Sequence, residues 1–297
     1  MKIKKVLLTI MGVSCIGLLG MSAVGCSNVK NDPSTLKGAY FNITETYENN
    51  DVVNSNELIK NLSEAKLKRT KDSVELETYE NDGSQSEYTT SKYEFKKGNE
   101  VFQVEYIGDD TKEPELENLY SAYYSILKDG SENAYLNMYY SEPIDGRLFL
   151  DMYLDSVEEQ REVTNLIYDN KEISNMYKVY YKIAQSIEDD SKITIPEIEE
   201  LLENKKLEKF DDYYKDANPN LESYTYTQGG LTMDIVYDGK ENQCYQIILE
   251  DIESGKVSLY YYKGMSYGIQ LKKINKDYKE QEAIVNKLME KRASDEK

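Results

Sequence analysis

The chain has 297 residues, of which 55 are acidic and 36 basic, and its formal net charge is −19. A field of this sign repels nucleic acid and anionic lipid, which excludes both as partners of the folded part. Histidine and tryptophan are absent, so that Ser-His-Asp and Cys-His nucleophiles and histidine-ligated metals are excluded, while 28 tyrosines supply most of the aromatic content.

The N-terminal leader has the three parts of an export signal. Lys2, Lys4 and Lys5 form a basic start, the segment 6–24 carries no charge, and small residues close it. An uncleaved membrane helix is the alternative, because nineteen uncharged residues approach the length of a span. The glycines within the segment and its small-residue end favour cleavage.

The stretch Ala23-Val24-Gly25-Cys26 resembles the lipobox of bacterial lipoproteins, although that family more often has leucine in the place of Ala23. The resemblance covers the leader alone. It implies that residues 1–25 are a signal peptide, cut just before Cys26, and that the Cys26 thiol carries a diacylglycerol. We therefore expect a protein anchored by lipid to the extracytoplasmic face of a bacterial membrane. Two or more acyl chains anchor stably, since each buried CH₂ contributes about 0.8 kcal/mol.

Composition divides the remaining chain into a tether and two halves. Residues 26–50 predict the lipidated cysteine and a flexible tether, with one apolar patch at 39–41 that fits an edge strand. The acidic run at 188–191 is the best internal boundary, which gives an N-terminal half at 51–190 and a C-terminal half at 191–297. Whether the halves form one sheet or two domains stays open.

Hydrophobic periodicity, capping residues and turn residues predict the elements in chain order. In the first half they are a helix at 54–65, strands at 74–76, 93–95 and 101–107, a helix at 114–127, strands at 135–140 and 147–154, and helices at 156–167 and 173–187. In the second half they are a helix at 194–210, strands at 223–227, 231–237, 244–250, 257–262 and 267–274, and a closing helix at 278–289. Separate runs of strands and helices indicate the α+β class, with antiparallel β-meanders flanked by helices. Two similar helix–meander–helix halves are one interpretation.

Tyrosines at alternating positions of two predicted strands form the candidate ligand-binding site. Tyr224 and Tyr226 share one side of their strand, and Tyr260 and Tyr262 share one side of theirs. Such a surface can bind a sugar or an extended peptide. The competing interpretation is that tyrosine replaces phenylalanine and tryptophan in the core and pairs across strands. We favour the competing interpretation, because tyrosines are spread over predicted helices as well.

Signatures of catalysis, cofactors and metals are missing from the sequence. It has no calcium-binding Asp-x-Asp-x-Asp-Gly loop, no phosphate or dinucleotide loop and no Gly-x-Ser-x-Gly motif. We therefore expect no cofactor and no metal site. Cys244 lies in an alternating strand and is expected to be a small buried residue.

These observations favour a membrane-anchored, non-catalytic domain that binds an envelope protein, a peptide or a glycan. A hydrolase that acts on an envelope or extracellular polymer through two carboxylates is the alternative, because such chemistry needs no histidine. Its mark would be a cleft that holds two facing carboxylates with raised pKa values. A solute-binding lipoprotein of a transporter ranks third, since such proteins alternate strands and helices around a hinge.

Overall fold

The computed structural model describes residues 31–49, 58, 60–62, 68–81, 84–107, 119–128, 134–141, 147–168, 174–210, 219–251, 255–265 and 268–295. All of them belong to one compact unit, Asn31–Lys297. The leader and Cys26 lie outside the described residues.

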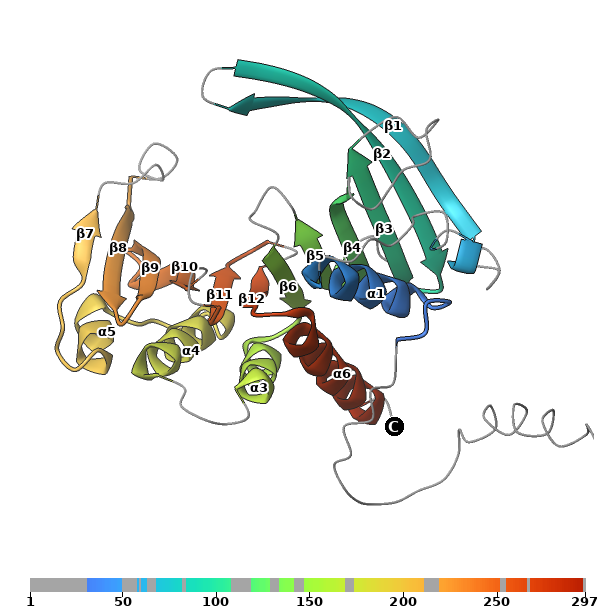
Figure 1. The fold of residues 1–297 in the computed structure, drawn as a ribbon. Helices are drawn as coiled ribbons and strands as arrows, with labels where there is room; N and C mark the ends of the chain where they lie inside the picture. Colours follow the sequence, from blue (N-terminus) through green and yellow to red (C-terminus); the bar gives the residue numbers. More distant parts are fainter. Residues whose placement is uncertain are drawn as a thin grey trace, which may run out of the picture. The chain divides into compact units, whose positions relative to one another are not determined.

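The fold is of the mixed α and β type and is built on one twelve-stranded antiparallel sheet (Figure 1). The strands are β1 (Lys68–Asn81), β2 (Ser84–Lys97), β3 (Glu100–Ile107), β4 (Leu119–Leu127), β5 (Ala134–Ser141), β6 (Arg147–Leu154), β7 (Glu208–Phe210), β8 (Leu221–Gln228), β9 (Leu231–Asp238), β10 (Gln243–Glu250), β11 (Val257–Tyr262) and β12 (Ile269–Asn275). Their order in the sheet is β1-β2-β3-β4-β5-β6-β12-β11-β10-β9-β8-β7. The sequence did not decide between one sheet and two. The pairing of β6 with β12 joins all the strands into one sheet.

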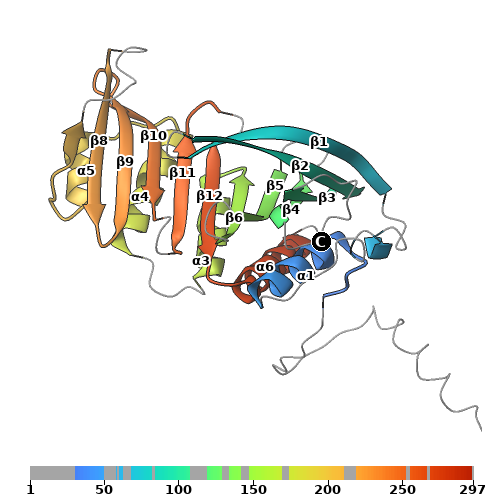
Figure 2. The same ribbon diagram turned by 45° about the horizontal axis from the view of Figure 1, so that its top comes forward.

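Helices cover one face of this sheet. They are α1 (Leu36–Glu48), α3 (Val157–Ile167), α4 (Asn175–Glu188), α5 (Ile195–Leu201) and α6 (Tyr278–Asp295). Helix α1 packs on β3 and β4, α6 and α3 on β6 and β12, and α4 on β9 and β10. Figure 2 shows β8, β9 and β10 in front of α4 and α5. None of the helices in the described part of the chain is long and apolar enough to span a bilayer.

Side chains that alternate along each strand separate a helix-covered face from an open face. The helix-covered face carries the core, which includes Phe95, Phe102, Val104, Tyr124, Ile126, Met138, Leu150, Met152, Leu271, Leu259, Ile247, Ile235 and Met233. The open face carries their strand neighbours, among them Lys92, Glu94, Gln103, Glu105, Tyr123, Tyr139, Phe149, Asp151, Lys272, Tyr260 and Tyr262. We use these two names for the faces below.

Two buried amides join the helices to the sheet. Gln281 of α6 donates from Nε2 to the Phe149 carbonyl oxygen at 2.8 Å and accepts from the Tyr40 hydroxyl at 2.9 Å. Gln160 of α3 donates to the Gln270 carbonyl oxygen at 2.6 Å. Both glutamines are fully buried, so these bonds fix how α1, α3 and α6 lie on β6 and β12.

The structure corrects the tether. Within 26–50, residues 36–48 form the helix α1 rather than a flexible segment with an edge strand. Thr35 caps this helix by accepting a hydrogen bond from the Gly38 backbone at 3.0 Å. Leu36, Tyr40 and Ile43 lie on one side of it and are at most 1% exposed. The apolar patch at 39–41 is part of this buried face, which its polar neighbours concealed.

The predicted helix at 114–127 is also wrong in its described part, because residues 119–127 form strand β4. Leu119, Tyr123 and Ile126 have helical spacing, but Ala122, Tyr124 and Ile126 alternate as well, and a short apolar run fits either period. The alternating set is the buried one. Pairing with β3 on one side and β5 on the other therefore makes this segment a strand rather than a helix.

Most other predicted elements are confirmed, with changed bounds. Thr194 and Glu197 form the expected capping box of α5, whereas at α3 the Ser156 side chain accepts from the Glu159 backbone and the Glu159 carboxylate accepts from the Asp155 backbone. The five predicted strands of the second half are β8 to β12. The helix expected at 194–210 ends at Leu201, and 208–210 form the edge strand β7. Of the helix at 54–65, the described residues are helical, with Leu58 and Leu62 buried.

Candidate binding face of the sheet

The four tyrosines proposed from the sequence lie on opposite faces of the sheet. Tyr224 and Tyr226 pair with core residues of β9 and therefore face the helices. Tyr260 and Tyr262 pair with β10 residues of the open face. The structure does not bring the two pairs together, since β9 and β10 also separate their strands.

The β8 pair has structural contacts. The Tyr224 ring meets the Tyr237 ring edge-on, with 6.3 Å between centroids, and the Lys209 ammonium lies 5.9 Å from the Tyr224 centroid. Its hydroxyl donates to Glu222 at 2.6 Å. Burial and this carboxylate both raise the pKa of Tyr224. These contacts agree with the competing interpretation, in which tyrosines pack and pair for stability.

The β11 pair belongs to a richer surface. Tyr260 stacks on Tyr262, with centroids 6.4 Å apart and planes at 10°, and its hydroxyl donates to Glu250 at 3.0 Å. The Lys272 ammonium lies 5.4 Å from the Tyr260 centroid. Tyr260 is only 7% exposed although no described helix packs on this face. Its neighbours on the open face therefore shield it.

A second aromatic group on the open face was missed from the sequence. Tyr123, Tyr139 and Phe149 come from β4, β5 and β6 and stack across the strands. The centroid of Tyr139 lies 5.7 Å from that of Tyr123 and 4.7 Å from that of Phe149, with planes at 23° and 11°. We call these three residues the aromatic ladder. Strands predicted at 135–140 and 147–154 gave a signal for its last two members, whereas the wrong helix at 114–127 hid Tyr123.

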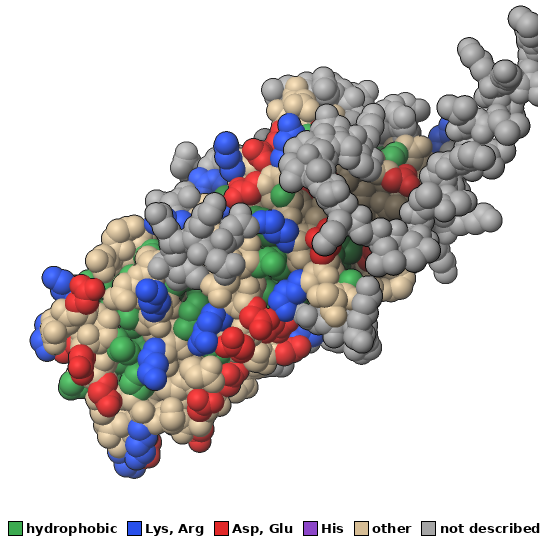
Figure 3. Space-filling view, turned by 90° about the horizontal axis from the view of Figure 1, so that it is seen from below, with side chains coloured by type: hydrophobic (Ala, Val, Ile, Leu, Met, Phe, Trp, Pro, Cys, Tyr) green, Lys and Arg blue, Asp and Glu red, His purple; other side chains and the backbone are tan. Residues whose placement is uncertain are grey.

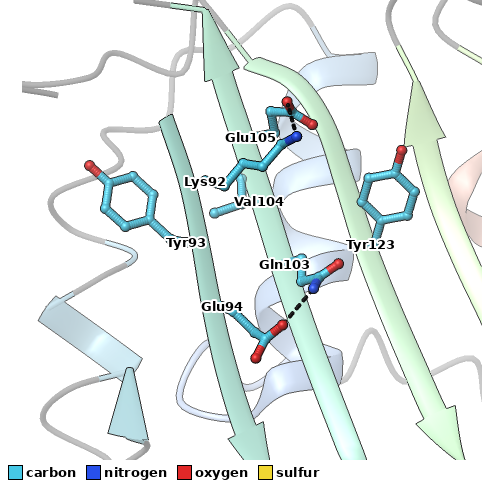
Figure 4. Close-up of a pocket in the computed structure, with 7 residues that line it drawn as sticks. All are labelled: Lys92, Tyr93, Glu94, Gln103, Val104, Glu105 and Tyr123. Atoms are coloured by element: carbon cyan, nitrogen blue, oxygen red, sulfur yellow. Dashed lines mark hydrogen bonds and ion pairs between the residues drawn. The ribbon is translucent and has the colours of Figure 1, made fainter. Parts of the chain in front are cut away.

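A cavity of about 330 Å³ lies beside the first residue of the ladder. The described residues that line it are Lys92, Tyr93, Glu94, Gln103, Val104, Glu105 and Tyr123. Figure 4 shows the polar side chains over β2 and β3 with Tyr123 at their side and α1 behind the strands. The volume falls in the range of small-ligand pockets, ~300–1,000 Å³. We call this cavity the β2–β4 pocket.

The register of two hairpins builds this pocket. Lys92 lies opposite Glu105, and Glu94 lies opposite Gln103, across β2 and β3. Gln103 in turn lies opposite Tyr123 across β3 and β4. Residues directly opposite each other on one face of an antiparallel pair have adjacent side chains, so all five lie in one patch.

Each carboxylate of the pocket is held by an ammonium group and by a neutral donor. Glu94 accepts from the Gln103 amide at 2.6 Å and lies 3.3 Å from the Lys96 ammonium. The Glu94 side chain is 13% exposed. The two partners fix its position within the pocket.

Glu105 is held in the same way, and its side chain is 11% exposed. Its Oε2 accepts from the Ser121 hydroxyl at 3.0 Å. Its Oε1 lies 3.2 Å from the Lys92 ammonium without the geometry of a hydrogen bond, and it accepts no hydrogen bond from a described residue. A buried carboxylate oxygen in this state can still accept a donor from a ligand.

Asp151 lies between the ladder and the β11 tyrosines. It is opposite Asn137 on β5 and Lys272 on β12, so it belongs to the open face. Its Oδ1 is buried and accepts no hydrogen bond from a described residue. Burial raises the pKa of Asp151 to about 6, although the Lys272 ammonium acts in the opposite direction.

This raised pKa predicts a pH-dependent stability that Asp151→Asn removes. The unfolded pKa is near 3.9, so the folded state loses stability as pH rises from about 4 to about 6, on the order of 2 kcal/mol. We expect Asp151→Asn to be more stable than the parent at pH 7.5, and to lose this advantage at pH 4. Thermal unfolding at both pH values measures it. An equal difference at the two pH values would show that burial does not oppose ionisation there.

The hydrolase alternative requires two facing carboxylates with raised pKa values. Among the described residues, the carboxyl groups with raised pKa are Asp151 and Glu48. Glu48 ends α1, on the helix-covered side, where its carboxylate accepts from the Tyr278 backbone at 2.9 Å. The two therefore lie on opposite sides of the sheet and do not face each other.

Other parts of the described structure give weaker evidence for a functional site. Cys244 is fully buried, as expected, and burial raises the pKa of its thiol to about 12. Within the described ranges, no group of three or more Cys, Asp and Glu residues is arranged to hold a metal ion. On the face seen in Figure 3, which is viewed from the helix side of Figure 1, acidic and basic side chains are interspersed with small hydrophobic patches.

Comparisons with protein-family models, curated proteins and solved structures give no match for this chain.

Proposed function

We propose that the protein is a lipoprotein, anchored through Cys26 at the extracytoplasmic face of a bacterial membrane, whose folded unit binds an envelope ligand without catalysis. The observation that carries the binding proposal is the β2–β4 pocket, with its two held carboxylates, at the end of the aromatic ladder. Aromatic rings with a few convergent polar groups in a hollow are typical of ligand sites. The anchor rests on the lipobox resemblance at 23–26 and the uncharged segment before it.

The open face is the surface that such an anchored unit would present to a ligand. The described helices pack on the opposite face of the sheet. On the open face, the aromatic ladder, Asp151 and the β11 tyrosines form a row from β4 to β11. Asp151 is half-buried there, and its buried Oδ1 accepts no hydrogen bond from a described residue, which costs stability. Such costs are concentrated at functional sites.

Replacing Tyr139 with alanine tests this assignment. The substitution interrupts the ladder between its two stacked contacts, each worth about 0.5–1.5 kcal/mol. We expect the unit 31–297 carrying Tyr139→Ala to bind isolated bacterial envelope about tenfold more weakly in a co-sedimentation assay. Phe210→Ala is the matched control, because Phe210 is an exposed aromatic residue, 38% exposed, on the edge strand β7. Equal retention of parent and Tyr139→Ala would contradict a role of this face.

A hydrolase remains the second proposal, favoured only by the presence of Glu94 and Glu105 in one pocket. Two carboxylates in one site are the minimum for glycoside hydrolysis. Release of reducing ends from envelope polysaccharide by the parent, and its loss in Glu105→Gln, would establish it. A solute-binding role ranks below both, because one continuous antiparallel sheet offers no pair of lobes.

We also propose that the fold contains two similar helix–meander–helix halves. In support, α1 precedes the run β1 to β6 and α3 follows it, while α5 precedes β7 to β12 and α6 follows. The two runs meet at β6 and β12 in opposite order. An experimental structure in which the two runs superpose no better than unrelated meanders would contradict this proposal.

A further inference from the structure

We infer that the β2–β4 pocket binds one pyranose unit of a neutral glycan, with the sugar ring against Tyr123 and its hydroxyl groups on Glu105, Glu94 and Gln103. This inference rests on the proposed function and adds the chemical class of the ligand.

The hydrogen-bonding groups of the pocket are mostly acceptors. Glu105 and Glu94 contribute carboxylate oxygens. Gln103 contributes its side-chain carbonyl oxygen as an acceptor, because its Nε2 donates a hydrogen bond to Glu94. The Glu105 Oε1, buried and accepting no hydrogen bond from a described residue, is the acceptor in greatest need of a donor. The ligand must therefore carry several donors within a small volume, as adjacent hydroxyl groups do.

The charges of the pocket favour a neutral ligand. The Lys92 and Lys96 ammonium groups lie 3.2 and 3.3 Å from the two carboxylates and largely neutralise their field, which removes the attraction for a cation. An anion would meet both carboxylates and a chain with a net charge of −19. An uncharged ligand that is rich in hydrogen-bond donors therefore fits both the acceptors and the charges of the pocket.

The position of the pocket disfavours a peptide. Extended peptides bind sheets by adding a strand at an edge, where backbone groups are free. The edges here are β1 and β7, whereas the pocket lies over β2, β3 and β4, and β3 is paired on both sides. Only side chains can recognise the ligand at this place.

The aromatic ladder supplies the remaining part of a sugar site. Stacking on Tyr139 fixes the orientation of the Tyr123 ring at the rim of the pocket. A fixed aromatic surface packs against the C–H groups of a pyranose while its hydroxyl groups reach the acceptors.

Saturation-transfer NMR and calorimetry with three neutral tetrasaccharides test the inference, using the unit 31–297. The probes are the β-1,4-linked tetramers of N-acetylglucosamine and glucose and the α-1,4-linked tetramer of glucose. We expect at least one to bind. Glu105→Gln should weaken that binding about tenfold or more, since hydrogen bonds to charged groups are worth about 1.5–3 kcal/mol.

Two further pocket variants and two controls keep the result readable if Glu105→Gln folds poorly. Gln103→Ala changes an exposed residue and should weaken binding severalfold. Tyr123→Ala should also weaken it, whereas Tyr123→Phe, which keeps the ring, and Phe210→Ala, which lies on β7, should bind like the parent. Thermal unfolding of each variant confirms that it is folded.

The outcomes separate this inference from the proposed function. Binding of none of the three tetrasaccharides, or binding unaffected by all three pocket variants, overturns the glycan inference. Displacement of a bound tetrasaccharide by spermidine would assign the pocket to a cation and also overturn it. If the envelope still retains the protein through Tyr139, the proposed function stands without the glycan. If retention fails as well, both fall.

Discussion

Replacing Cys26 with serine is expected to abolish lipid attachment and leave the leader on the chain. The resemblance of residues 23–26 to the lipobox implies that the peptidase cuts just before a cysteine whose thiol carries a diacylglycerol, and serine supplies neither the thiol nor that cleavage site. The parent, expressed in a bacterium fed an alkyne fatty acid, should carry the label and begin at Cys26. The variant should carry no label and should be heavier at its N-terminus by intact mass.

Cys15→Ser is the matched control for this experiment. Cys15 lies inside the uncharged segment and is expected to be removed with the leader, so its substitution should have no effect on labelling. The loss in Cys26→Ser should be complete rather than partial, because no other cysteine follows before Cys244, which is fully buried. Label that persists in Cys26→Ser, or a parent without label, would contradict the anchor.

Gln281→Leu is expected to lower the free energy of unfolding by about 2–4 kcal/mol. The side chain is fully buried and joins the Phe149 carbonyl of β6 to the Tyr40 hydroxyl of α1. Leucine has similar size but removes the hydrogen bond to the Phe149 carbonyl and leaves the buried Tyr40 hydroxyl without its Gln281 acceptor, and a buried polar group without a partner costs about 1–3 kcal/mol. Urea unfolding followed by circular dichroism measures the change.

A double substitution separates the lost hydrogen bonds from a packing defect. Tyr40→Phe added to Gln281→Leu removes the hydroxyl that lacks a partner and should recover part of the stability. Glu290→Leu, at an exposed position of the same helix, should change stability by no more than about 0.5 kcal/mol. If Gln281→Leu is as stable as Glu290→Leu, the buried amide does not fix α1 and α6 on the sheet.

The elements with strong local signals could be predicted from the sequence. Ser156 and Thr194 mark helix starts by capping, and the turns after Gln228 and Asp238 mark hairpins in the second half. The element at 36–48 could not be placed, because its apolar face is spread among polar residues and its stability comes from packing on β3 and β4. Strand β4 was predicted as a helix for a different reason, because its apolar residues fit both the helical and the strand period.

The faces of the sheet could not be predicted, and with them the site. Tyr224 and Tyr260 both stand in alternating strands, and only the placement of the helices decides that one faces the core and the other the open face. The β2–β4 pocket did leave a signal. Gly98, with a φ of 61°, forms the turn between β2 and β3. Because Lys97 pairs with Glu100, three further steps along each strand place Glu94 opposite Gln103.

Lysine footprinting by mass spectrometry tests most directly whether the open face is the binding face. The unit 31–297 is acetylated with and without isolated bacterial envelope, and the modification rates of individual lysines are compared. We predict that the envelope slows acetylation of Lys92 and Lys96, in the pocket and beside it, and leaves Lys178 and Lys182 unchanged on the exposed side of α4. Protection of Lys178 and Lys182 with none at Lys92 and Lys96 would contradict the account and assign binding to the helices.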